Sequence, residues 1–490
     1  MTKLKELFSD TLIYGISNVL ARFINYLLVP VYTKVFDTTQ YGIVSLIYAA
    51  IVFLNVIFTF GMESAYLRYA KDRERARTVF KTIQLSLLGL ASFLAFLLWL
   101  FAPSIMPLLS LPSGARNIYL MMVGILWFDT LSLLPFAELR LVRKAFQYAG
   151  IRMANVLINL GLNLYLILGL GWGIEAVFIA NLAASGLTTL FIWMLTAKMW
   201  RGNWSGYIFR KAIRFGLPLV PAGLGYAVNE MLDRFFLNNY MSQQTVTNLY
   251  GTGVHPAGVV GIYSACYKLA VFMLLLIQMF RMAWQPFFLR HADDEEAPAL
   301  YAEVFLHFNA IAGAVFLGIA LFAHQIVHIH IPILNAYLID PKFWSGLSIV
   351  PLVLGAYWFH GWYMNFSAGI YIEEKTGIFS QITLLGALIT LGGCFLFIPY
   401  LGMMGAALAT LISYGSMALV LCWRVQHVYP VPYPYKKVIF IMALSVGFYL
   451  LQVPVSRWIG TEWIANIFLF LIGAGGIAGV ALASLKKFQF

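Results

Sequence analysis

Residues 82–103 decide the fold class, and they read TIQLSLLGLASFLAFLLWLFAP. This run holds no charged residue and is long enough to cross a bilayer as one helix, which takes about 20 apolar residues. Similar runs recur along the 490 residues, of which 61% are apolar and 11% are charged. A soluble domain carries roughly 25% charged residues. The sequence therefore predicts an all-α polytopic membrane protein, and it excludes a soluble or disordered chain.

Outward from this run, about fourteen apolar segments are predicted to span the membrane. They cover residues 11–36, 41–62, 82–103, 117–138, 151–170, 174–197, 214–240, 259–286, 303–326, 345–370, 378–398, 402–423, 438–456 and 463–485. An even number of spans places both termini on one side. The loops on the opposite side hold three basic residues, Arg116, Lys342 and Arg457, although the net charge is +12. The basic side faces the cytoplasm, so both termini are predicted to be cytoplasmic, and the charge does not indicate a nucleic-acid partner.

Two pairs of segments look alike at matching places in the two halves. The second and eighth spans begin with the similar stretches 41–45 and 260–264, and the sixth and twelfth begin at the glycine-rich turns 171–176 and 402–407. The alternative is that such helix starts are simply common in membrane proteins. A parallel repeat predicts two pseudo-symmetric six-helix lobes around a central cavity. The predicted divisions are an N-terminal lobe at 1–200, a C-terminal lobe at 201–424 and two further helices at 425–490.

Two basic residues lie near the predicted middle of spans. Arg22 and Lys268 are about 17 Å and 14 Å along their helices at 1.5 Å per residue, and neither has an acidic residue three or four positions away. Charged groups at this depth are costly and mark functional sites. Asn18 and Asn25 share the helix face of Arg22. We expect a water-filled cavity for an anion, and the alternative is snorkelling or pairing with backbone carbonyls.

Other ionisable residues lie closer to span ends. Asp233 and Arg234, toward the outer end of the seventh span, either pair across helices or contact substrate, with Arg234 at the outer mouth of the cavity. Glu63 and Arg281 lie at inner span ends, where interface anchoring is favoured over a gating role. Glu175 begins the sixth span, and a role in cation or proton binding is the minor alternative there.

Two further features concern helix shape and packing. Three prolines are predicted to bend their spans, either as static kinks or as hinges for alternating access: Pro30, Pro218 and Pro221. Three asparagines share one face of the fifth span, which favours hydrogen bonding between helices: Asn155, Asn159 and Asn163.

Motifs for enzymatic chemistry are missing from the sequence. It contains no nucleotide-binding glycine loop, no G-x-S-x-G, no H-E-x-x-H and no C-x-x-C. His324, His328 and His330 cluster near an outer helix end without an acidic or cysteine ligand close by in sequence, so no metal site is predicted. The cysteines all fall inside apolar runs and are expected to be buried hydrophobes. The sequence therefore favours a protein that is not an enzyme, needs no cofactor and does not use ATP.

The order of several short motifs resembles the polysaccharide-exporter branch of the multidrug/oligosaccharidyl-lipid/polysaccharide (MOP) flippase superfamily, the Wzx-type O-antigen or capsule repeat-unit flippases. The motifs are Tyr14–Asn18, Arg22, Pro30–Lys34, Tyr41-Gly42, Phe215–Pro221, Asp233-Arg234, Gly261–Ser264, Ala283–Phe287 and Gly402–Ala409. They extend over nearly the whole chain, although the stretch 242–258 departs from the compact pattern expected there.

The resemblance implies a flippase of the bacterial cytoplasmic (inner) membrane. Its substrate would be an undecaprenyl-diphosphate-linked oligosaccharide, the repeat unit of O-antigen, capsule or exopolysaccharide. It would move from the cytoplasmic to the outer leaflet by alternating access, with Arg22 and Lys268 in a cationic cavity. Coupling to H⁺ or Na⁺ is left open. The expected partners are the lipid-linked substrate, membrane lipids and other polysaccharide-assembly proteins, and not nucleic acid.

Three alternatives remain at this stage. A lipid II flippase of the same superfamily is similar in design. A multidrug/cation antiporter would favour acidic groups in the cavity, whereas Arg22 and Lys268 are basic. A membrane polysaccharide polymerase or ligase would be expected to carry a larger outer loop with catalytic residues.

Overall fold

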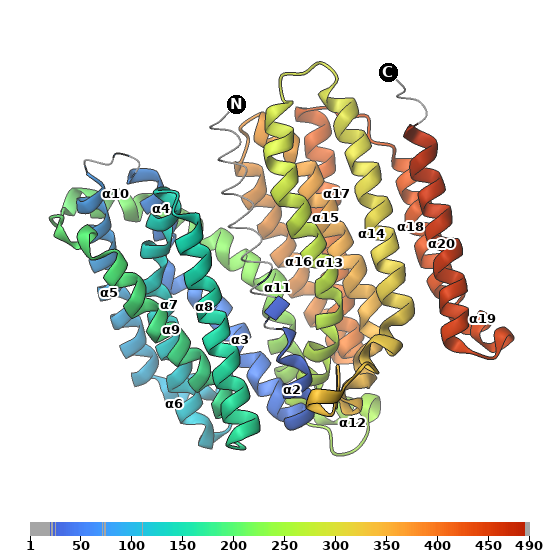
Figure 1. The fold of residues 1–490 in the computed structure, drawn as a ribbon, viewed down its shortest axis with the longest axis horizontal. Helices are drawn as coiled ribbons and strands as arrows, with labels where there is room; N and C mark the ends of the chain where they lie inside the picture. Colours follow the sequence, from blue (N-terminus) through green and yellow to red (C-terminus); the bar gives the residue numbers. More distant parts are fainter. Residues whose placement is uncertain are drawn as a thin grey trace. The chain divides into compact units, whose positions relative to one another are not determined.

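The computed structural model describes residues 20, 23–24, 26–70, 72, 75–109 and 111–485, and most of them are helical (Figure 1). The chain forms two compact units, Met1–Gly261 and Ile262–Phe490. Long apolar helices dominate both, which confirms the predicted all-α polytopic membrane fold. The finer division at residues 200 and 424 stays a prediction.

The first unit contains eleven α-helices, counted within its described residues, and the beginning of a twelfth. In chain order its elements are α2 Val29–Val35, α3 Thr38–Thr59, α4 Met62–Tyr69, α5 Ala76–Leu100, α6 Ala102–Leu108, η1 Ser113–Ala115, α7 Arg116–Leu141, α8 Ala145–Leu164, the π-helix η2 Tyr165–Gly169, α9 Glu175–Leu195, η3 Ala197–Arg201, α10 Gly206–Gly216, η4 Leu217–Leu219, α11 Val220–Asn239 and α12 Gln243–Tyr250.

The second unit begins within the longest helix. Its elements are α13 Pro256–Arg290, α14 Ala297–Val327, β1 His330–Ile331, η5 Pro332–Leu334, β2 Ala336–Tyr337, η6 Pro341–Ile349, α15 Val350–Ile372, α16 Gly377–Leu401, α17 Met403–Val428, α18 Tyr435–Leu450, α19 Gln452–Ile459 and α20 Glu462–Leu485. The two short strands pair antiparallel, with His330 opposite Tyr337.

The number of spanning helices agrees with the prediction once three exceptions are explained. Among the described residues, ten helices are long and apolar enough to cross a membrane, and an eleventh span is formed if α18 and α19, bent by 44°, are taken together. The predicted span 11–36 falls largely outside the described residues. Helix α11 carries three ionisable residues, and α15 is rich in Tyr, Trp, His and Asn. Their polarity lowers the hydropathy of two helices that still have spanning length.

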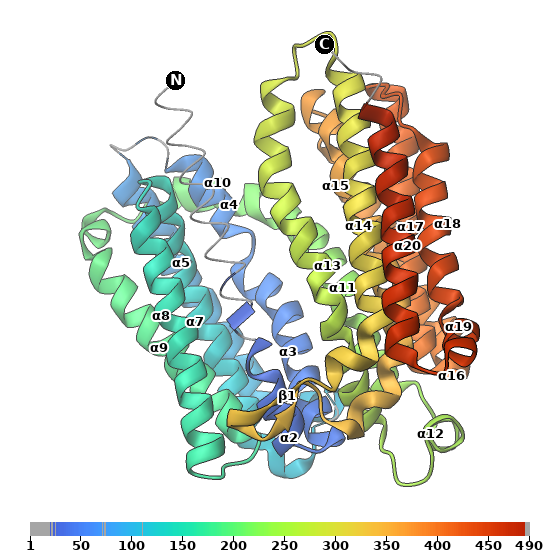
Figure 2. The same ribbon diagram turned by 45° about the vertical axis from the view of Figure 1, so that its right-hand side comes forward.

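The order of helix neighbours repeats between the two halves. In the first unit α7 packs against α5 and α9, and α8 packs against α9. Six spans later, α15 packs against α14 and α17, and α16 packs against α17. The helices α9 and α17 also each follow a glycine with positive φ, Gly171 at +67° and Gly402 at +55°. These matching neighbours confirm the internal repeat, while α18 and α20 pack on α14 as an addition to it (Figure 2).

Helix α3 has strong local signals at both ends. The Asp37 side chain accepts a hydrogen bond from the Gln40 backbone N–H, and the Gln40 side chain accepts one from the Asp37 N–H, which forms a capping box. The helix ends at Phe60 and Gly61, whose φ angles are +50° and +67°. Only glycine adopts such angles readily. Helix α3 therefore ends at Thr59, and α4 begins as a separate helix at Met62.

The beginnings of α3 and α13 cross without intervening side chains. A Cβ atom at Gly42 would overlap the backbone oxygen of Ala257, and one at Gly261 would overlap that of Thr38. Small residues spaced by four allow helix backbones to approach closely in membranes. The two glycines belong to the matching stretches 41–45 and 260–264, so the repeated motif builds this contact.

One buried asparagine joins two helices of the second unit. Asn309 on α14 is fully buried, and its side-chain oxygen accepts hydrogen bonds from the indole N–H groups of Trp358 at 2.8 Å and Trp362 at 2.6 Å. Its amide nitrogen donates to the backbone oxygen of Phe305. Large indole rings can therefore be buried here because each N–H has a partner.

Three predicted spans differ in their boundaries. Within the span predicted at 11–36, Leu27 and Leu28 form a turn and α2 begins at Val29. The span predicted to begin at residue 214 begins at Val220, because α10 ends at Gly216 and a 3₁₀ turn follows. The predicted span 438–456 is broken at Leu451. Conversely, α13 and α14, with 35 and 31 residues, extend beyond the apolar runs that identified them.

Candidate functional site

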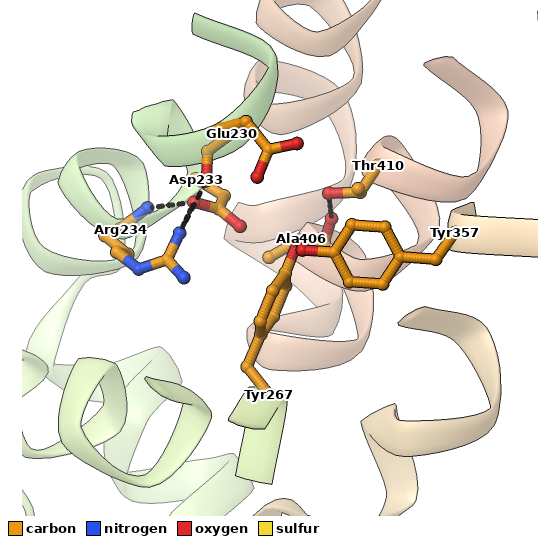
Figure 3. A network of polar contacts seen from close by, with 7 residues as sticks. All are labelled: Glu230, Asp233, Arg234, Tyr267, Tyr357, Ala406 and Thr410. Atoms are coloured by element: carbon orange, nitrogen blue, oxygen red, sulfur yellow. Dashed lines mark hydrogen bonds and ion pairs between the residues drawn. The ribbon is translucent and has the colours of Figure 1, made fainter. Parts of the chain in front are cut away.

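Helix α11 carries a buried polar segment in the first unit. Five of its polar side chains are less than 9% exposed: Asn229, Glu230, Asp233, Arg234 and Asn238. The Arg234 guanidinium donates through Nη1 to Asp233 Oδ1 at 2.9 Å and to the Glu230 backbone oxygen at 2.8 Å (Figure 3). An ion pair between the two residues is therefore present within α11.

This pairing follows from helix geometry and burial. The Glu230 oxygen lies one turn before Arg234, so a guanidinium that folds back along its own helix reaches both acceptors. An unpaired charge in this environment would be strongly unfavourable. The Asp233–Arg234 pair has no net charge. The buried Glu230 is a further acidic residue of α11 outside this pair.

Lys268 lies on α13 in the second unit, about 18 Å along the helix from its first residue, and its side chain is half-buried. Hydroxyl-bearing residues surround this part of α13. The Tyr357 hydroxyl donates to the Tyr267 hydroxyl oxygen at 3.1 Å (Figure 3). The Ser264 hydroxyl has no hydrogen-bond partner among the described residues. Lys268 thus lies far along a spanning helix that also carries hydroxyl groups, and its place in a cavity stays a prediction.

A second polar group occupies the middle of α7. Asp129 lies about 20 Å along this helix, and its side chain is exposed. Its carboxylate accepts a hydrogen bond from the Ser185 side chain on α9 and lies within electrostatic range of Arg152 on α8. The Arg152 guanidinium carbon lies 4.3 Å from the centroid of the Phe136 ring. The first unit therefore exposes an acidic group in the middle of α7 and a basic group near the beginning of the predicted fifth span.

The asparagine stripe of the fifth span forms hydrogen bonds between helices, as predicted. Asn155 on α8 donates to the Thr188 hydroxyl on α9 at 2.9 Å. Asn163 accepts from the Tyr32 hydroxyl on α2 at 2.8 Å and donates to the Asn159 side chain at 2.9 Å. These bonds hold α8 to its neighbours and explain the stripe without a substrate.

The three residues at span ends differ from one another. Glu63 forms an ion pair with Arg140 of α7, and both side chains are 35% exposed. Glu175 is exposed in the first turn of α9, where a carboxylate stabilises the helix dipole. Arg281 is exposed on α13 and lines a pocket of the second unit. The positions of Glu63 and Glu175 are of the kind that anchors span ends, Arg281 lines a pocket, and the roles of all three stay predictions.

The three prolines begin helices and do not kink them. Pro30 and Pro221 lie in the first turns of α2 and α11, and Pro218 lies in the 3₁₀ turn before α11. A proline lacks the backbone N–H that would be unpaired in a first turn anyway, so these positions suit it. The predicted kinks within spans are therefore breaks between elements.

Three predicted cavity residues, Asn18, Arg22 and Asn25, lie outside the described residues. Their roles stay predictions.

Sequence reasoning overlooked several acidic residues within spans. Asp129 and Glu138 lie on α7, and Glu230 lies on α11. Glu138 is 4% exposed and accepts a hydrogen bond from the Tyr66 hydroxyl at 2.6 Å. A scan of the apolar runs for carboxylates, applied as it was for cations, would have found all three. The picture of a purely cationic membrane interior was therefore incomplete.

The outer histidines contact aromatic and polar neighbours. The rings of His324 and His328 lie 4.3 Å apart, and the His328 ring lies 3.9 Å from that of Trp344. His330 Nε2 lies 3.2 Å from the Asn335 side-chain oxygen. Among the described residues, no group of three or more His, Cys, Asp or Glu side chains is placed to hold a metal ion.

Solved transporter structures share this fold. A lipid II flippase MurJ in an inward closed conformation matches with a TM-score of 0.69 and 15% identity, covering 94% of this chain and 98% of that chain. A multidrug resistance MATE family transporter of the MOP superfamily matches in its inward-facing conformation with a TM-score of 0.64 and 17% identity, covering 85% and 94%. Its outward-facing conformation matches with a TM-score of 0.56 and 18% identity, covering 86% and 95%. These identities establish similarity of fold.

The sequence itself gives the family. No curated protein matches the chain at a significant level. The family described as "Polysaccharide biosynthesis protein" matches residues 7–291, which is more than half of the chain and includes α3 through α13. The protein therefore belongs to the polysaccharide biosynthesis protein family, with the fold of the MOP superfamily transporters.

Proposed function

We propose that the protein is a flippase for an undecaprenyl-diphosphate-linked oligosaccharide, the repeat unit of O-antigen, capsule or exopolysaccharide. Membership of the polysaccharide biosynthesis family is the observation that carries the proposal. The fold shared with a lipid II flippase supports it, since that protein is named for moving a lipid-linked sugar precursor. Nothing in this activity requires catalysis of bond formation.

The charged groups at span depth support a polar route for the substrate. A diphosphate cannot cross hydrocarbon unaided, because charges at the bilayer centre are strongly disfavoured. Lys268 lies about 18 Å along α13, and Arg152 lies about 10 Å along α8; each of these cations is at least partly exposed. Together with Arg22 they would attract the diphosphate, while the lipid tail stays in the bilayer. Alternating access would carry the headgroup between the two sides.

We infer that the protein lies in the bacterial cytoplasmic membrane with both termini in the cytoplasm. The unequal distribution of basic residues between loops supports this orientation. The substrate would then enter from the cytoplasmic leaflet. Other polysaccharide-assembly proteins are the expected neighbours in the membrane.

Complementation tests the proposal. A strain that lacks its own repeat-unit flippase is given the parent protein, Lys268→Ala, Lys268→Arg or the loop variant Lys375→Ala. The parent and the Lys375 control are expected to restore surface polysaccharide, Lys268→Ala to abolish it at a normal membrane level of protein, and Lys268→Arg to restore part. If the parent protein restores surface polysaccharide with none of the tested repeat units, the flippase proposal is contradicted. Normal display by Lys268→Ala would remove Lys268 from the route.

A cation antiporter is the second candidate, and the acidic residues favour it. Asp129 is exposed at mid-span, and Glu230 is buried beside a neutral ion pair. Cationic drugs would bind to such carboxylates. Expression in a strain without drug exporters separates the two functions, because an antiporter would raise drug resistance without restoring polysaccharide.

A further inference from the structure

A small pocket opens on the second unit between α13, α15 and α16. It has a volume of about 220 Å³, and the polar and aromatic residues important here are Arg281, Trp284, Gln285, Tyr363, Ser367 and Tyr371. All of them belong to one compact unit. Pockets for drug-sized ligands begin at about 300 Å³. This space therefore suits a single sugar or phosphate group and not a whole oligosaccharide.

Trp284 places an unused hydrogen-bond donor in this pocket. The residue is 3% exposed, and its indole Nε1 has no partner among the described residues. Its ring is fixed by stacking on Phe280 at 5.6 Å and by an edge contact with Tyr301 at 5.4 Å. Buried N–H groups normally have a partner. Trp284 lines the pocket, so a bound ligand is the candidate source of the missing acceptor.

The neighbouring groups define the chemistry of that ligand. The Arg281 side chain is exposed, and a guanidinium binds phosphate oxygens in a bidentate manner. Its charge also acts on His360, whose Nδ1 is a second buried atom without a partner in the described chain. Tyr363 and Tyr371 line the pocket with aromatic rings, which suit the C–H groups of a pyranose, and Gln285 and Ser367 add polar atoms. The set matches a sugar that carries phosphate.

The position along α13 agrees with a headgroup site. Arg281 lies about 38 Å from the first residue of α13, which exceeds the roughly 30 Å of a hydrocarbon core. In the proposed orientation this end of α13 faces the cytoplasm. The pocket then lies at the level of the headgroups in the leaflet from which the substrate enters.

We propose that this pocket binds the phosphate and first sugar of the lipid-linked substrate before translocation. Arg281 pairs with the phosphate, Trp284 Nε1 donates to a phosphate or sugar oxygen, and the tyrosine rings hold the sugar face. The inference rests on the proposed function and names the recognition site for it.

Binding to the purified full-length protein in nanodiscs tests the pocket directly. The probe is N-acetylglucosamine 1-phosphate, compared with neutral N-acetylglucosamine and inorganic phosphate by calorimetry. We expect the sugar phosphate to bind best. Trp284→Phe keeps the ring but removes the N–H, so it should weaken binding about tenfold, as expected for a hydrogen bond to a charged group. Arg281→Gln should weaken it further, and Arg281→Lys should be intermediate.

The matched control is Trp423→Phe, an indole on α17 that is 59% exposed and lies outside the pocket. It should bind like the parent. Unfolding temperatures verify that each variant is folded. Parent-like binding by folded Trp284→Phe and Arg281→Gln, or no measurable binding by the parent, would overturn the pocket assignment.

Export in the complementation strain separates this inference from the proposed function. If the parent restores polysaccharide and Trp284→Phe exports less at an equal protein level, both stand. If the parent exports and the folded pocket variants bind and export like it, the pocket assignment fails and the flippase remains. If the parent does not export but binds sugar phosphate through Trp284, the pocket stands and the flippase proposal fails.

Discussion

Asp129 combines three properties that are seldom found together at mid-span. It is ionisable, its side chain is exposed, and its bonded partner, Ser185, is neutral. The charged group facing it is Arg152 on α8, and Tyr48 on α3 is also within electrostatic range. A carboxylate in this position is stable if water hydrates it or if it takes up a proton. Movement of the surrounding helices would change the balance between these two states.

Asp129→Asn keeps the hydrogen bond with Ser185 but removes the titratable group. If Asp129 binds the coupling proton, the variant loses a driving force of about 2.3 kcal/mol per 100 mV of membrane potential. Export is expected to fall, and what remains should no longer respond to external pH. The measurement is surface polysaccharide at several pH values, with Asp129→Glu and Ser185→Ala as controls. Parent-like pH dependence in Asp129→Asn would exclude the proton role.

The Asp233–Arg234 pair gives a second prediction at this scale. Arg234→Met leaves the Asp233 carboxylate buried without its cation, which costs about 3–5 kcal/mol for a broken buried pair. We expect a lower unfolding temperature and less protein in the membrane. The double variant Asp233→Asn, Arg234→Met removes both charges and should recover part of the loss. If the double variant is no more stable than Arg234→Met, loss of the Asp233–Arg234 ion pair is not the cause of the lower unfolding temperature.

Individual residues were partly predictable. Lys268 could be located far along its helix because a lysine in an apolar run is visible in the sequence, and its role in a cavity stays a prediction. Whether Asp233 and Arg234 bond within α11 or across helices depended on side-chain rotamers, which spacing alone does not reveal. The pocket around Trp284 was missed because it is formed by residues from three helices, and a tryptophan in an apolar run carries no signal of its own.

At the scale of elements, the crossing of α3 and α13 depends on two glycines. Backbone atoms occupy the places where side chains would stand. Few interdigitated side chains then need to separate if the helices part, so such a contact can open and close at low cost. The prolines act differently from these glycines, because they fix the residues at which α2 and α11 begin.

Gly42→Ala and Gly261→Ala each test this crossing. Because backbone cannot yield as a flexible side chain does, each methyl group should destabilise the contact by about 1–3 kcal/mol or more. Gly161→Ala on α8 is the matched control, since nothing lies within 4 Å of its added Cβ, and it should be neutral or slightly stabilising. Unfolding temperatures of the purified variants report the difference. Equal effects at all three sites would contradict a close backbone contact.

Most elements could be predicted, because an apolar run of spanning length has few alternatives to a helix. Their ends were less predictable. Hydropathy marks only the part of α13 and α14 within the membrane, whereas backbone hydrogen bonding continues the helices into water. The break before α11 follows from Pro218 and Pro221, which end one helix and begin another but were interpreted as kinks. The helix α12, in the stretch 242–258, is too polar to appear as an apolar run.

The whole molecule consists of two units whose helix neighbours follow the same order. Motif similarity between the halves predicted this repeat, because a duplicated sequence keeps its turn glycines even when its apolar residues drift. How the units are placed is not encoded in any local pattern. The cavity between lobes that the sequence suggests therefore stays a prediction.

The orientation of the whole chain is tested by cysteine labelling. The native cysteines Cys266, Cys394 and Cys422 are replaced by alanine, and one cysteine is introduced at Gly251 or at Lys375. A membrane-impermeant maleimide is expected to label position 251 in intact cells, and position 375 only after the inner membrane is permeabilised. The opposite result would reverse the proposed direction of transport, and surface polysaccharide verifies that each variant is functional.

The lengths of α13 and α14 have an electrostatic consequence. At 35 residues, α13 is about 52 Å long, roughly 20 Å more than a hydrocarbon core. Its junction with α14 carries four exposed acidic residues, Asp293, Asp294, Glu295 and Glu296. In the proposed orientation this tip stands beyond the lipid headgroups, where a Debye length of about 8 Å screens it from their negative charge. The acidic tip therefore does not counteract the attraction of the short basic loops to anionic lipids, and it presents the cytoplasm with a charge opposite to that of these loops.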